Sequence, residues 1–206
     1  MTSGLSRSAL SPMDEAGVVA RLNPLLLTTA DAIALEPPGE MESAVLVPLT
    51  VKDGRISILF TRRPDEMRRH AGEYSFPGGR RDEHEKDLLA TALRETEEEI
   101  GIRERDVTII GALQPTATIA TGFSVHPFVG IVPDGAARIA EPAEVAEIVV
   151  LDAFELMNSV ERRRLSRPGA AFRASVYPLG DRVIWGATGR ILADLFDRIG
   201  PLLSEQ

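Results

Sequence analysis

A glutamate-rich segment that ends in glycine constrains this chain more than any other feature of its sequence. Four of the five residues from Glu95 to Glu99 are glutamate, and they close a stretch that runs from Asp87 to Ile100. On a helical wheel, apolar and small side chains of this stretch fall on one stripe, which we expect to face the core; they are Leu89, Leu93, Thr96 and Ile100. Gly101 follows directly and is the residue type that typically ends a helix.

Three of the glutamates share a different face of this predicted helix. Glu95, Glu98 and Glu99 are spaced i, i+3 and i+4, and side chains at that spacing are neighbours. Like charges so placed destabilise an isolated helix by roughly 0.2–0.5 kcal/mol per pair, and the C-terminal end of a helix disfavours anions. A divalent cation would remove this penalty, and an all-oxygen ligand set favours Mg²⁺ or Mn²⁺ over zinc. The alternative is a solvated acidic face, which the glutamates alone do not exclude.

The composition limits the other classes of function. The chain has no cysteine, which excludes disulfides, zinc–thiolate sites, iron–sulfur clusters and a cysteine nucleophile. The net charge of −8 leaves no general basic surface for a nucleic-acid backbone, so we expect no nucleic-acid partner. No apolar run approaches the roughly 20 residues of a membrane-spanning helix, and the N-terminus lacks the apolar segment of a secretory signal. We therefore expect a cytoplasmic protein with no membrane partner.

The order of the predicted elements indicates an α+β domain. We expect a helix over 13–23, strands over 43–51 and 55–63 joined by a Lys-Asp-Gly turn, two or three strands over 107–133, a strand and a helix capped by Asp152 over 144–157, a hairpin over 174–186 and an amphipathic helix over 187–203. Strands and helices do not alternate regularly, which argues against a doubly wound parallel sheet. The 206 residues allow one sizeable domain. We assign residues 1–35 to a lead-in with a short helix and residues 36–206 to a single domain.

Two glycines upstream extend the glutamate helix into a longer motif. Phe76–Gly79 reads Phe-Pro-Gly-Gly, and glycine lets the backbone approach a ligand closely. With the helix, this stretch resembles the Nudix box, and the matching positions are Gly79, Arg94, Glu95, Glu98, Glu99, Gly101 and Ile102. Thr96 stands where an aliphatic residue is common. Eight residues separate Glu85 from Arg94, one more than in the usual box, which leaves the role of Glu85 open.

The resemblance implies a Nudix fold, an α/β/α sandwich around a mixed β-sheet. It also implies Mg²⁺- or Mn²⁺-dependent hydrolysis of a nucleoside diphosphate that is linked to a further group. By this resemblance the metal ligands are Glu95, Glu98, Glu99 and the backbone carbonyl of Gly79, and Arg94 orients the glutamates. The general base would be Glu98, Glu99 or a carboxylate from a later segment (Glu141, Glu144 or Glu147), and among the latter we favour Glu144.

A second motif, Leu59–Gly79, resembles the signature of the coenzyme A pyrophosphatase branch. Its matches are Leu59, Thr61, Arg63, Arg68, Gly72, Phe76, Pro77, Gly78 and Gly79, while Phe60 and Pro64 depart from it. The longer spacer in the box, Thr121–Gly130 and Ile184–Leu192 also resemble this branch. The substrate implied is coenzyme A or a derivative, cleaved to 3′,5′-ADP and 4′-phosphopantetheine.

The basic residues of this second motif are candidates for substrate binding. Arginine forks suit phosphate groups, and the substrate-binding candidates are Arg63, Arg68, His70 and Phe76. The alternative for the arginines of this segment is ion pairing with nearby carboxylates, namely Asp65, Glu66, Asp82 or Glu83. His126 either faces the pocket or packs in the core.

Three further readings stay open from the sequence. Another Nudix substrate, such as ADP-ribose or a dinucleoside polyphosphate, would use the same box. A Nudix-fold sensor that binds nucleotides without hydrolysis is a second possibility, although such proteins usually lose box carboxylates and this chain keeps them. A homodimer is compatible with the sequence but does not follow from it.

Overall fold

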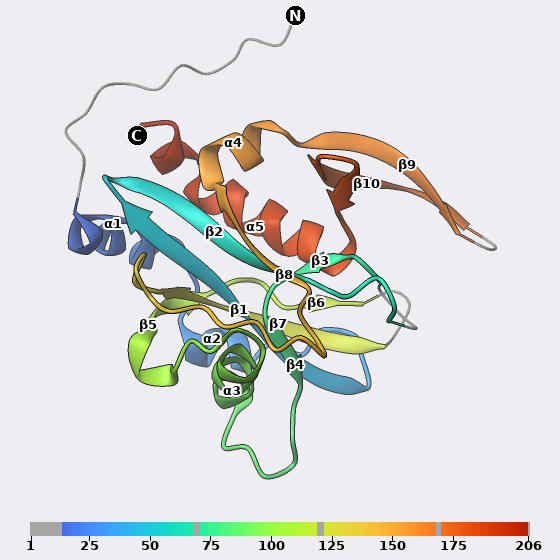
Figure 1. Ribbon diagram of the computed structural model, residues 1–206, viewed down its shortest axis with the longest axis horizontal. Coiled ribbons are helices and arrows are strands. Elements are labelled where there is room, and N and C mark those ends of the chain that lie inside the picture. The colour runs from blue at the N-terminus through green and yellow to red at the C-terminus, as the bar shows by residue number, and fades with distance from the viewer. Residues whose placement is uncertain (1–13, 68–70, 119–121, 168–169, 206) are drawn as a thin grey trace, which may run out of the picture.

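The computed structural model describes residues 14–67, 71–118, 122–167 and 170–205, and it shows a mixed sheet between two layers of helices (Figure 1). The strands of this sheet are β1 (Met41–Lys52), β2 (Arg55–Arg62), β3 (Tyr74–Ser75), β4 (Gly78–Arg80), β5 (Thr108–Ala112), β6 (Thr116–Ala117), β7 (Phe123–Ile131) and β8 (Glu147–Asp152). Their order is β3-β2-β1-β7-β5, with β4 beside β1, β6 beside β7 and β8 beside β2. Among these pairs β1 and β7 are parallel and the others antiparallel. The predicted α+β fold with a mixed sheet is confirmed.

Helices cover both faces of this sheet. They are α1 (Glu15–Leu22), α2 (Thr29–Ile33), α3 (Leu88–Ile100), α4 (Ala153–Asn158) and α5 (Gly186–Leu203), with short 3₁₀ turns at Asn23–Leu25 and Glu104–Asp106. In the view of Figure 1, α2 and α3 lie below the sheet, while α4 and α5 lie above it. Within the described residues, no helix combines the length and the apolar character needed to cross a membrane.

Strand β1 shows how the sequence buries both faces of the sheet. Side chains alternate between the two faces of a strand. Ala44 and Leu46 accordingly pack with α2 and α3, whereas Val47 and Leu49 pack in the larger core with α5. The Lys-Asp-Gly turn after β1 has positive φ at both Asp53 and Gly54, as a two-residue hairpin turn requires.

The N-terminal helix belongs to the same core. Asp14 caps α1 by accepting a hydrogen bond from the N–H of Gly17. Val18 and Leu22 are fully buried in the cluster that also contains α5. The core therefore includes side chains on both sides of residue 36, the boundary predicted from the sequence between the lead-in and the domain.

A second, smaller sheet carries the chain into its last helix. It consists of β9 (Glu161–Arg167), β10 (Ala170–Leu179) and β11 (Arg182–Ile184). The hairpin predicted over 174–186 corresponds to β10 and β11, whereas β9 was not predicted. The β9–β10 ribbon extends away from the body of the molecule at the upper right of Figure 1.

The end of α3 generates a test of the fold. Gly101 has φ of 72°, and its N–H donates to the carbonyl of Glu97. A Cβ at this position would meet atoms of Ile139 at 3.4 Å or more, which is ordinary contact. We therefore expect Gly101→Ala to lower the free energy of unfolding by about 1–2 kcal/mol through backbone strain alone, measured by urea denaturation.

Asparagine provides the matched comparison at this position, since it tolerates the left-handed conformation better than alanine does. Gly101→Asn should recover part of the loss. Equal stability of the alanine variant and the wild-type protein would contradict the assigned strain.

Candidate active site

Helix α3 presents the predicted core stripe to the sheet. Leu93, Thr96 and Ile100 are buried, as the periodicity predicted, while Leu89 is only partly buried. Thr96 stands where the box commonly has an aliphatic residue, and its hydroxyl donates to the carbonyl of Ala92 at 2.6 Å. Because that bond satisfies the buried hydroxyl, the threonine leaves no unpaired polar group in the core.

Three carboxylates meet beside the C-terminal half of α3. Glu95, Glu99 and Glu144 each offer a carboxylate oxygen, and these oxygens lie within 4.8 Å of one another. Glu99 is only 5% exposed. Burial, together with the charges of Glu95 and Glu144, raises the pKa of Glu99 to about 8. Burial also raises the pKa of Glu95, against the opposing effect of Arg94. Such a cluster is unfavourable in its ionised form unless a proton or a cation compensates it.

A turn that docks on the end of α3 brings Glu144 to this cluster. The N–H groups of Ile139 and Glu141 donate to the carbonyls of Ile100 and Glu99, each at 2.9 Å. These carbonyls would otherwise lack partners at the end of the helix. The sequence placed Glu144 at the start of a strand. That was wrong, because Glu144 lies in a turn and β8 begins at Glu147.

Glu98 lies apart from the three clustered carboxylates. Its side chain is 59% exposed and pairs with Nη1 of Arg94 at 2.8 Å. The single patch of Glu95, Glu98 and Glu99 expected from helical spacing is therefore divided, with Glu99 buried and Glu98 on the solvent side. The charge of Glu98 still contributes to the raised pKa of Glu95. Its roles as a metal ligand and catalytic residue stay predictions.

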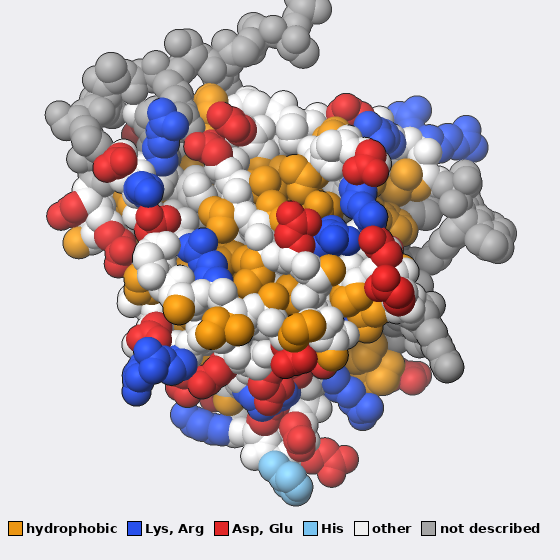
Figure 2. All heavy atoms as spheres, viewed as in Figure 1, with side chains coloured by type: hydrophobic (Ala, Val, Ile, Leu, Met, Phe, Trp, Pro, Cys, Tyr) orange, Lys and Arg blue, Asp and Glu red, His pale blue; other side chains and the backbone are white. Residues whose placement is uncertain are grey.

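Arg94 holds three glutamates at once. Its Nε pairs with Glu85, its Nη2 with Glu95 and its Nη1 with Glu98, each at 2.8 Å. Burial lowers the pKa of Arg94, but the hydrogen bond to Glu85 and the interactions with Glu95 outweigh it, so the pKa lies above its ordinary value. Around α3, Lys and Arg side chains lie among Asp and Glu side chains on the lower part of the face shown in Figure 2.

Glu85 has a defined place despite the longer spacer. Besides Arg94, it accepts hydrogen bonds from the hydroxyl of Thr91 and the N–H of Asp82, both at 2.7 Å. Burial opposes ionisation of Glu85, but these three donors outweigh it and lower its pKa. Glu85 thus anchors Arg94, which in turn contacts Glu95.

The two glycines of β4 lie directly against the carboxylates. A Cβ on Gly79 would be 2.4 Å from Cδ of Glu95, so a side chain there would displace that carboxylate. Gly78 donates a backbone hydrogen bond to the carboxylate of Glu99. Its φ is 153°, and a Cβ there would be 2.3 Å from the carbonyl oxygen of Ala44. Glycine at position 78 therefore lets β4 lie close to β1, and glycine at position 79 leaves room for the Glu95 carboxylate.

The arginines at the end of β2 differ in their partners. Arg62 pairs with Glu147 at 3.0 Å and Asp65 at 3.3 Å, so the ion-pair alternative holds for it. Arg63 is different, because its Nε is buried without a hydrogen-bond partner among the described residues. The positive charge of Arg63 acts to lower the pKa of Glu99, which indicates that its guanidinium lies near the cluster.

The other candidates for substrate binding divide into two groups. Arg68 and His70 lie outside the described residues. Phe76 is only 3% exposed and stacks on Phe60 with a centroid distance of 5.0 Å, so packing accounts for its side chain. His126 is 3% exposed, its Nδ1 is buried without a hydrogen-bond partner among the described residues, and burial lowers its pKa. It packs in the core between the sheet and α2.

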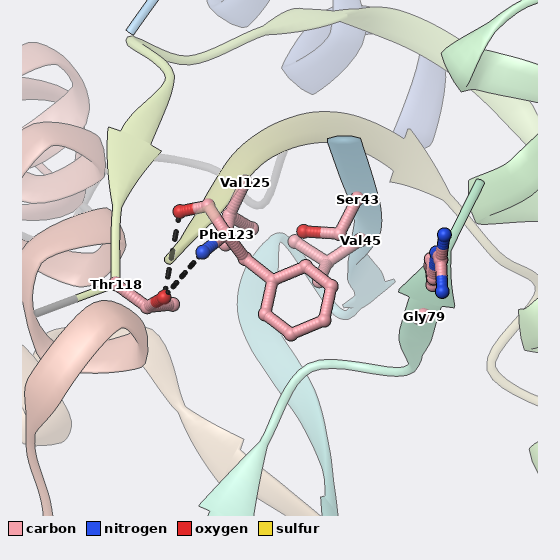
Figure 3. Close-up of a pocket in the computed structure, with 8 residues that line it drawn as sticks. Ser43, Val45, Gly79, Thr118, Phe123 and Val125 are labelled. Atoms are coloured by element: carbon pink, nitrogen blue, oxygen red, sulfur yellow. Dashed lines mark hydrogen bonds between the residues drawn. The ribbon is translucent and has the colours of Figure 1, made fainter. Parts of the chain in front are cut away.

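A pocket of about 180 Å³ adjoins the cluster. It is lined by Ser43, Val45, Gly78, Gly79, Arg80, Thr118, Phe123 and Val125. In Figure 3 the ring of Phe123 stands between Thr118 and Gly79. The hydroxyl of Thr118 accepts a hydrogen bond from the N–H of Phe123 at 2.9 Å. Gly79 of β4 lines the pocket and also lies against the Glu95 carboxylate. Strand β4 therefore borders both the pocket and the carboxylate cluster.

Comparisons with known proteins agree with this architecture. The NUDIX domain family matches residues 41–172. The protein named uncharacterized Nudix hydrolase NudL of Photorhabdus laumondii is 37% identical over 159 residues, which cover 76% of this chain and 84% of the relative. Its namesake in Yersinia enterocolitica is 35% identical over 159 residues, which cover 76% and 80% of the two chains.

A solved structure supports the fold. The MutT/nudix family protein from Enterococcus faecalis superimposes with a TM-score of 0.56 at 15% identity, covering 92% of this chain and 75% of its own. At that identity the likeness concerns the fold alone. The family match extends over most of the chain, and the curated relatives exceed 30% identity over most of their own length. This chain therefore belongs to the Nudix hydrolase family.

Proposed function

We propose that this protein is a Mg²⁺- or Mn²⁺-dependent pyrophosphatase that hydrolyses the diphosphate of coenzyme A or its derivatives. The products would be 3′,5′-ADP and 4′-phosphopantetheine or its acyl form. The observation that carries the hydrolytic activity is the cluster of Glu95, Glu99 and Glu144, in which Glu99 is buried, together with the Nε of Arg63, which has no hydrogen-bond partner among the described residues. The choice of coenzyme A rests on the Leu59–Gly79 signature in the sequence.

The donor set fits a hard divalent cation. All three clustered groups are carboxylates, and oxygen ligands are those that Mg²⁺ and Mn²⁺ prefer. Glu95, Glu99 and Glu144 would hold the ion, and the motif adds Glu98 and the carbonyl of Gly79. When bound, such an ion neutralises charge on a diphosphate and lowers the pKa of a water molecule bound to it.

Other side chains would bind the phosphate, accept the proton of the attacking water and orient the glutamates. Arg63 would bind a phosphate oxygen through its guanidinium, since its buried Nε has no hydrogen-bond partner among the residues that the structure describes. Glu144, which is the exposed member of the cluster, would accept a proton from the attacking water at a carboxylate oxygen. Arg94 would keep Glu95 and Glu98 oriented through its ion pairs.

The pocket beside the cluster would bind an organic part of the substrate. Phe123 offers an aromatic face, and Ser43 and Thr118 offer hydroxyl groups. Its volume of about 180 Å³ is below the roughly 300–1,000 Å³ of pockets that enclose a drug-sized ligand. We therefore propose that it takes one ring system, such as the adenine of coenzyme A, stacked on Phe123.

The first prediction concerns the products. Incubated with Mn²⁺, the protein should convert coenzyme A to 3′,5′-ADP and 4′-phosphopantetheine, detected by mass spectrometry. Glu99→Gln should lower kcat roughly 100-fold or more, because the charge stabilisation that a bound ion supplies is worth several kcal/mol. Glu97→Gln, on the same helix but exposed and outside the cluster, is the matched control and should retain activity.

A panel of substrates separates the alternatives. ADP-ribose and a diadenosine polyphosphate are incubated in parallel with coenzyme A. Preferential cleavage of either compound would support the proposed hydrolytic activity but would reject coenzyme A as the substrate. Binding of nucleotides without any cleavage would instead favour a sensor.

The second prediction uses the contact between Gly79 and Glu95. Gly79→Ala should displace the Glu95 carboxylate and weaken Mn²⁺ binding on the order of 10- to 100-fold, the range for lost support of a metal ligand. The backbone of Gly79 has an ordinary φ, so the substitution adds no left-handed strain. Titration of Mn²⁺ by electron paramagnetic resonance measures the effect. Gly135→Ala is the control, because nothing lies within 4 Å of a Cβ there, and it should bind Mn²⁺ as the wild-type protein does.

The third prediction concerns pH and stability without metal. Glu99 has a pKa of about 8 in the folded protein against an ordinary value of 4.5, so the folded state holds this proton more tightly than the unfolded state does. The contribution of Glu99 to the free energy of unfolding is complete at pH values below its ordinary pKa, and it is lost as the pH rises toward about 8. The Tm of the chelator-treated protein should therefore fall between pH 5.5 and about 8.5 by calorimetry.

Two comparisons make this pH dependence specific. The Glu99→Gln variant has no ionisable group at this position, so its Tm should vary less with pH than that of the wild-type protein over the same range. Excess Mn²⁺ should reduce the fall in the wild-type protein, since a cation stabilises the ionised carboxylates. Carboxylates with lowered pKa values, such as Glu85, lose their contribution only at more acidic pH. Burial lowers the pKa of His126 from 6.5, which favours stability at higher pH, but this opposite effect is common to the wild-type and variant proteins and cancels in their comparison. Identical pH profiles of the wild-type and variant proteins would refute the assignment to Glu99.

A further inference from the structure

We propose that Arg190 of α5 is a positioning residue for the substrate pocket, acting through the segment from Gln114 to Thr118. This proposal rests on the proposed function, because it assigns the pocket to the organic part of the substrate. Arg190 lies beyond residue 172, where the match to the NUDIX domain ends. It belongs to Ile184–Leu192, a stretch that resembles the coenzyme A branch but to which neither the box nor the signature gives a role.

One face of α5 holds this segment in place. Nε of Arg190 donates to the hydroxyl of Thr116 at 2.9 Å, and its Nη2 donates to the carbonyl of Ala117. Asp194, one turn further along the helix, accepts a hydrogen bond from the N–H of Gln114 at 2.8 Å. Side chains spaced i and i+4 lie on the same face of a helix. Two backbone groups of the segment thus depend on α5 side chains as hydrogen-bond partners.

The bonding of Arg190 is unusual for a partly buried cation. Among the described residues, no carboxylate pairs with it, and both of its acceptors are neutral oxygens. Burial lowers the pKa of Arg190, as expected for a desolvated cation that has only neutral hydrogen-bond acceptors among the described residues. A leucine or methionine would fill this space at lower electrostatic cost. The hydrogen bonds to the segment are what the arginine adds.

These hydrogen bonds continue to the aromatic wall of the pocket. Ala117 is followed by Thr118, whose N–H donates to the carbonyl of Phe123 at 2.8 Å. The hydroxyl of Thr118 in turn accepts from the N–H of Phe123 at 2.9 Å, as the dashed lines of Figure 3 show. Strand β6 pairs with β7 at only two positions, Thr116 and Ala117. Loss of Arg190 should therefore loosen Thr118 and Phe123 together.

The carboxylate cluster does not depend on these contacts. Glu95 and Glu99 are on α3, and Glu144 is in a turn docked on the end of that helix. The supports described for them come from Arg94, Gly78 and the 139–141 backbone, and none of these bonds to Arg190. A positioning role in the pocket therefore predicts a change in substrate binding with metal binding unchanged.

The experiment compares Arg190→Met and Arg190→Lys with the wild-type protein. For coenzyme A hydrolysis we expect Arg190→Met to raise KM about tenfold, as expected for lost charge-assisted hydrogen bonds, with a much smaller change in kcat. Arg190→Lys keeps the positive charge but offers one donor nitrogen in place of the two that Arg190 uses, and it should give an intermediate KM. The Mn²⁺ dissociation constant should be unchanged in both variants. A KM equal to that of the wild-type protein, or an equal loss of Mn²⁺ affinity, would overturn the positioning role.

Asp197 provides the control on the same helix. Its side chain is exposed, and it takes part in none of the hydrogen bonds that join α5 to the 114–118 segment. Asp197→Asn removes a charge from α5 and should leave KM near the wild-type value. A KM increase in Asp197→Asn equal to that in Arg190→Met would assign the effect to α5 in general and refute the specific role.

Amide hydrogen exchange separates this inference from the proposed function. In metal-free protein without substrate, Arg190→Met should accelerate exchange at residues 114–118 and leave α3 unchanged. If the wild-type protein cleaves no compound of the panel, the proposed function fails and this exchange result still decides the inference. Unaltered exchange at 114–118 would reject it.

Discussion

The burial of like-charged carboxylates is the constraint around which the rest of the site is arranged. Glu99 lies almost fully inside the protein with two other carboxylates beside it, and nothing in the packing of apolar side chains favours that arrangement. Groups on several sides limit the cost: Arg63 near Glu99, Arg94 against Glu95, and the N–H of Gly78. Gly79 is required for the same reason, because a side chain at this position would occupy the place of the Glu95 carboxylate.

Repulsion between like charges is typical of functional sites, where ionisable groups needed for function lower the stability of the folded protein. The remainder of the molecule follows ordinary rules of packing. Its strands alternate between two apolar layers, and α1 and α5 fill the larger core. The repulsion among Glu95, Glu99 and Glu144 lies beside the C-terminal half of α3, apart from these apolar layers. That separation explains why the residues of α3 divide sharply into core positions and site positions.

The sequence predicted those features that depend on local pattern. The bounds of α3 followed from the apolar stripe and the terminal Gly101, and the β1–β2 hairpin followed from its turn residues. Glu144 was suggested as a base, but its meeting with Glu95 and Glu99 depends on a turn docking on the end of a helix, which no periodicity encodes. Strand β9 was missed because Glu161–Arg167 reads Glu-Arg-Arg-Arg-Leu-Ser-Arg, without the apolar alternation of a half-buried strand. The hydrogen bonds of Arg190 link segments more than 70 residues apart, so spacing gave no sign of them.

The parallel pairing of β1 with β7 has a consequence for the order of folding. Parallel neighbours need a long crossover, and here the crossover contains β4 and α3. The centre of the sheet therefore cannot close until the chain has been synthesised through Ile131, and Glu144 follows still later. The charge of Glu144 is thus added only after the central strands β1 and β7 are both available to pair. Helix α5, which fills the larger core, is synthesised later still, so the full anionic site and the completed core belong to the same late stage of assembly.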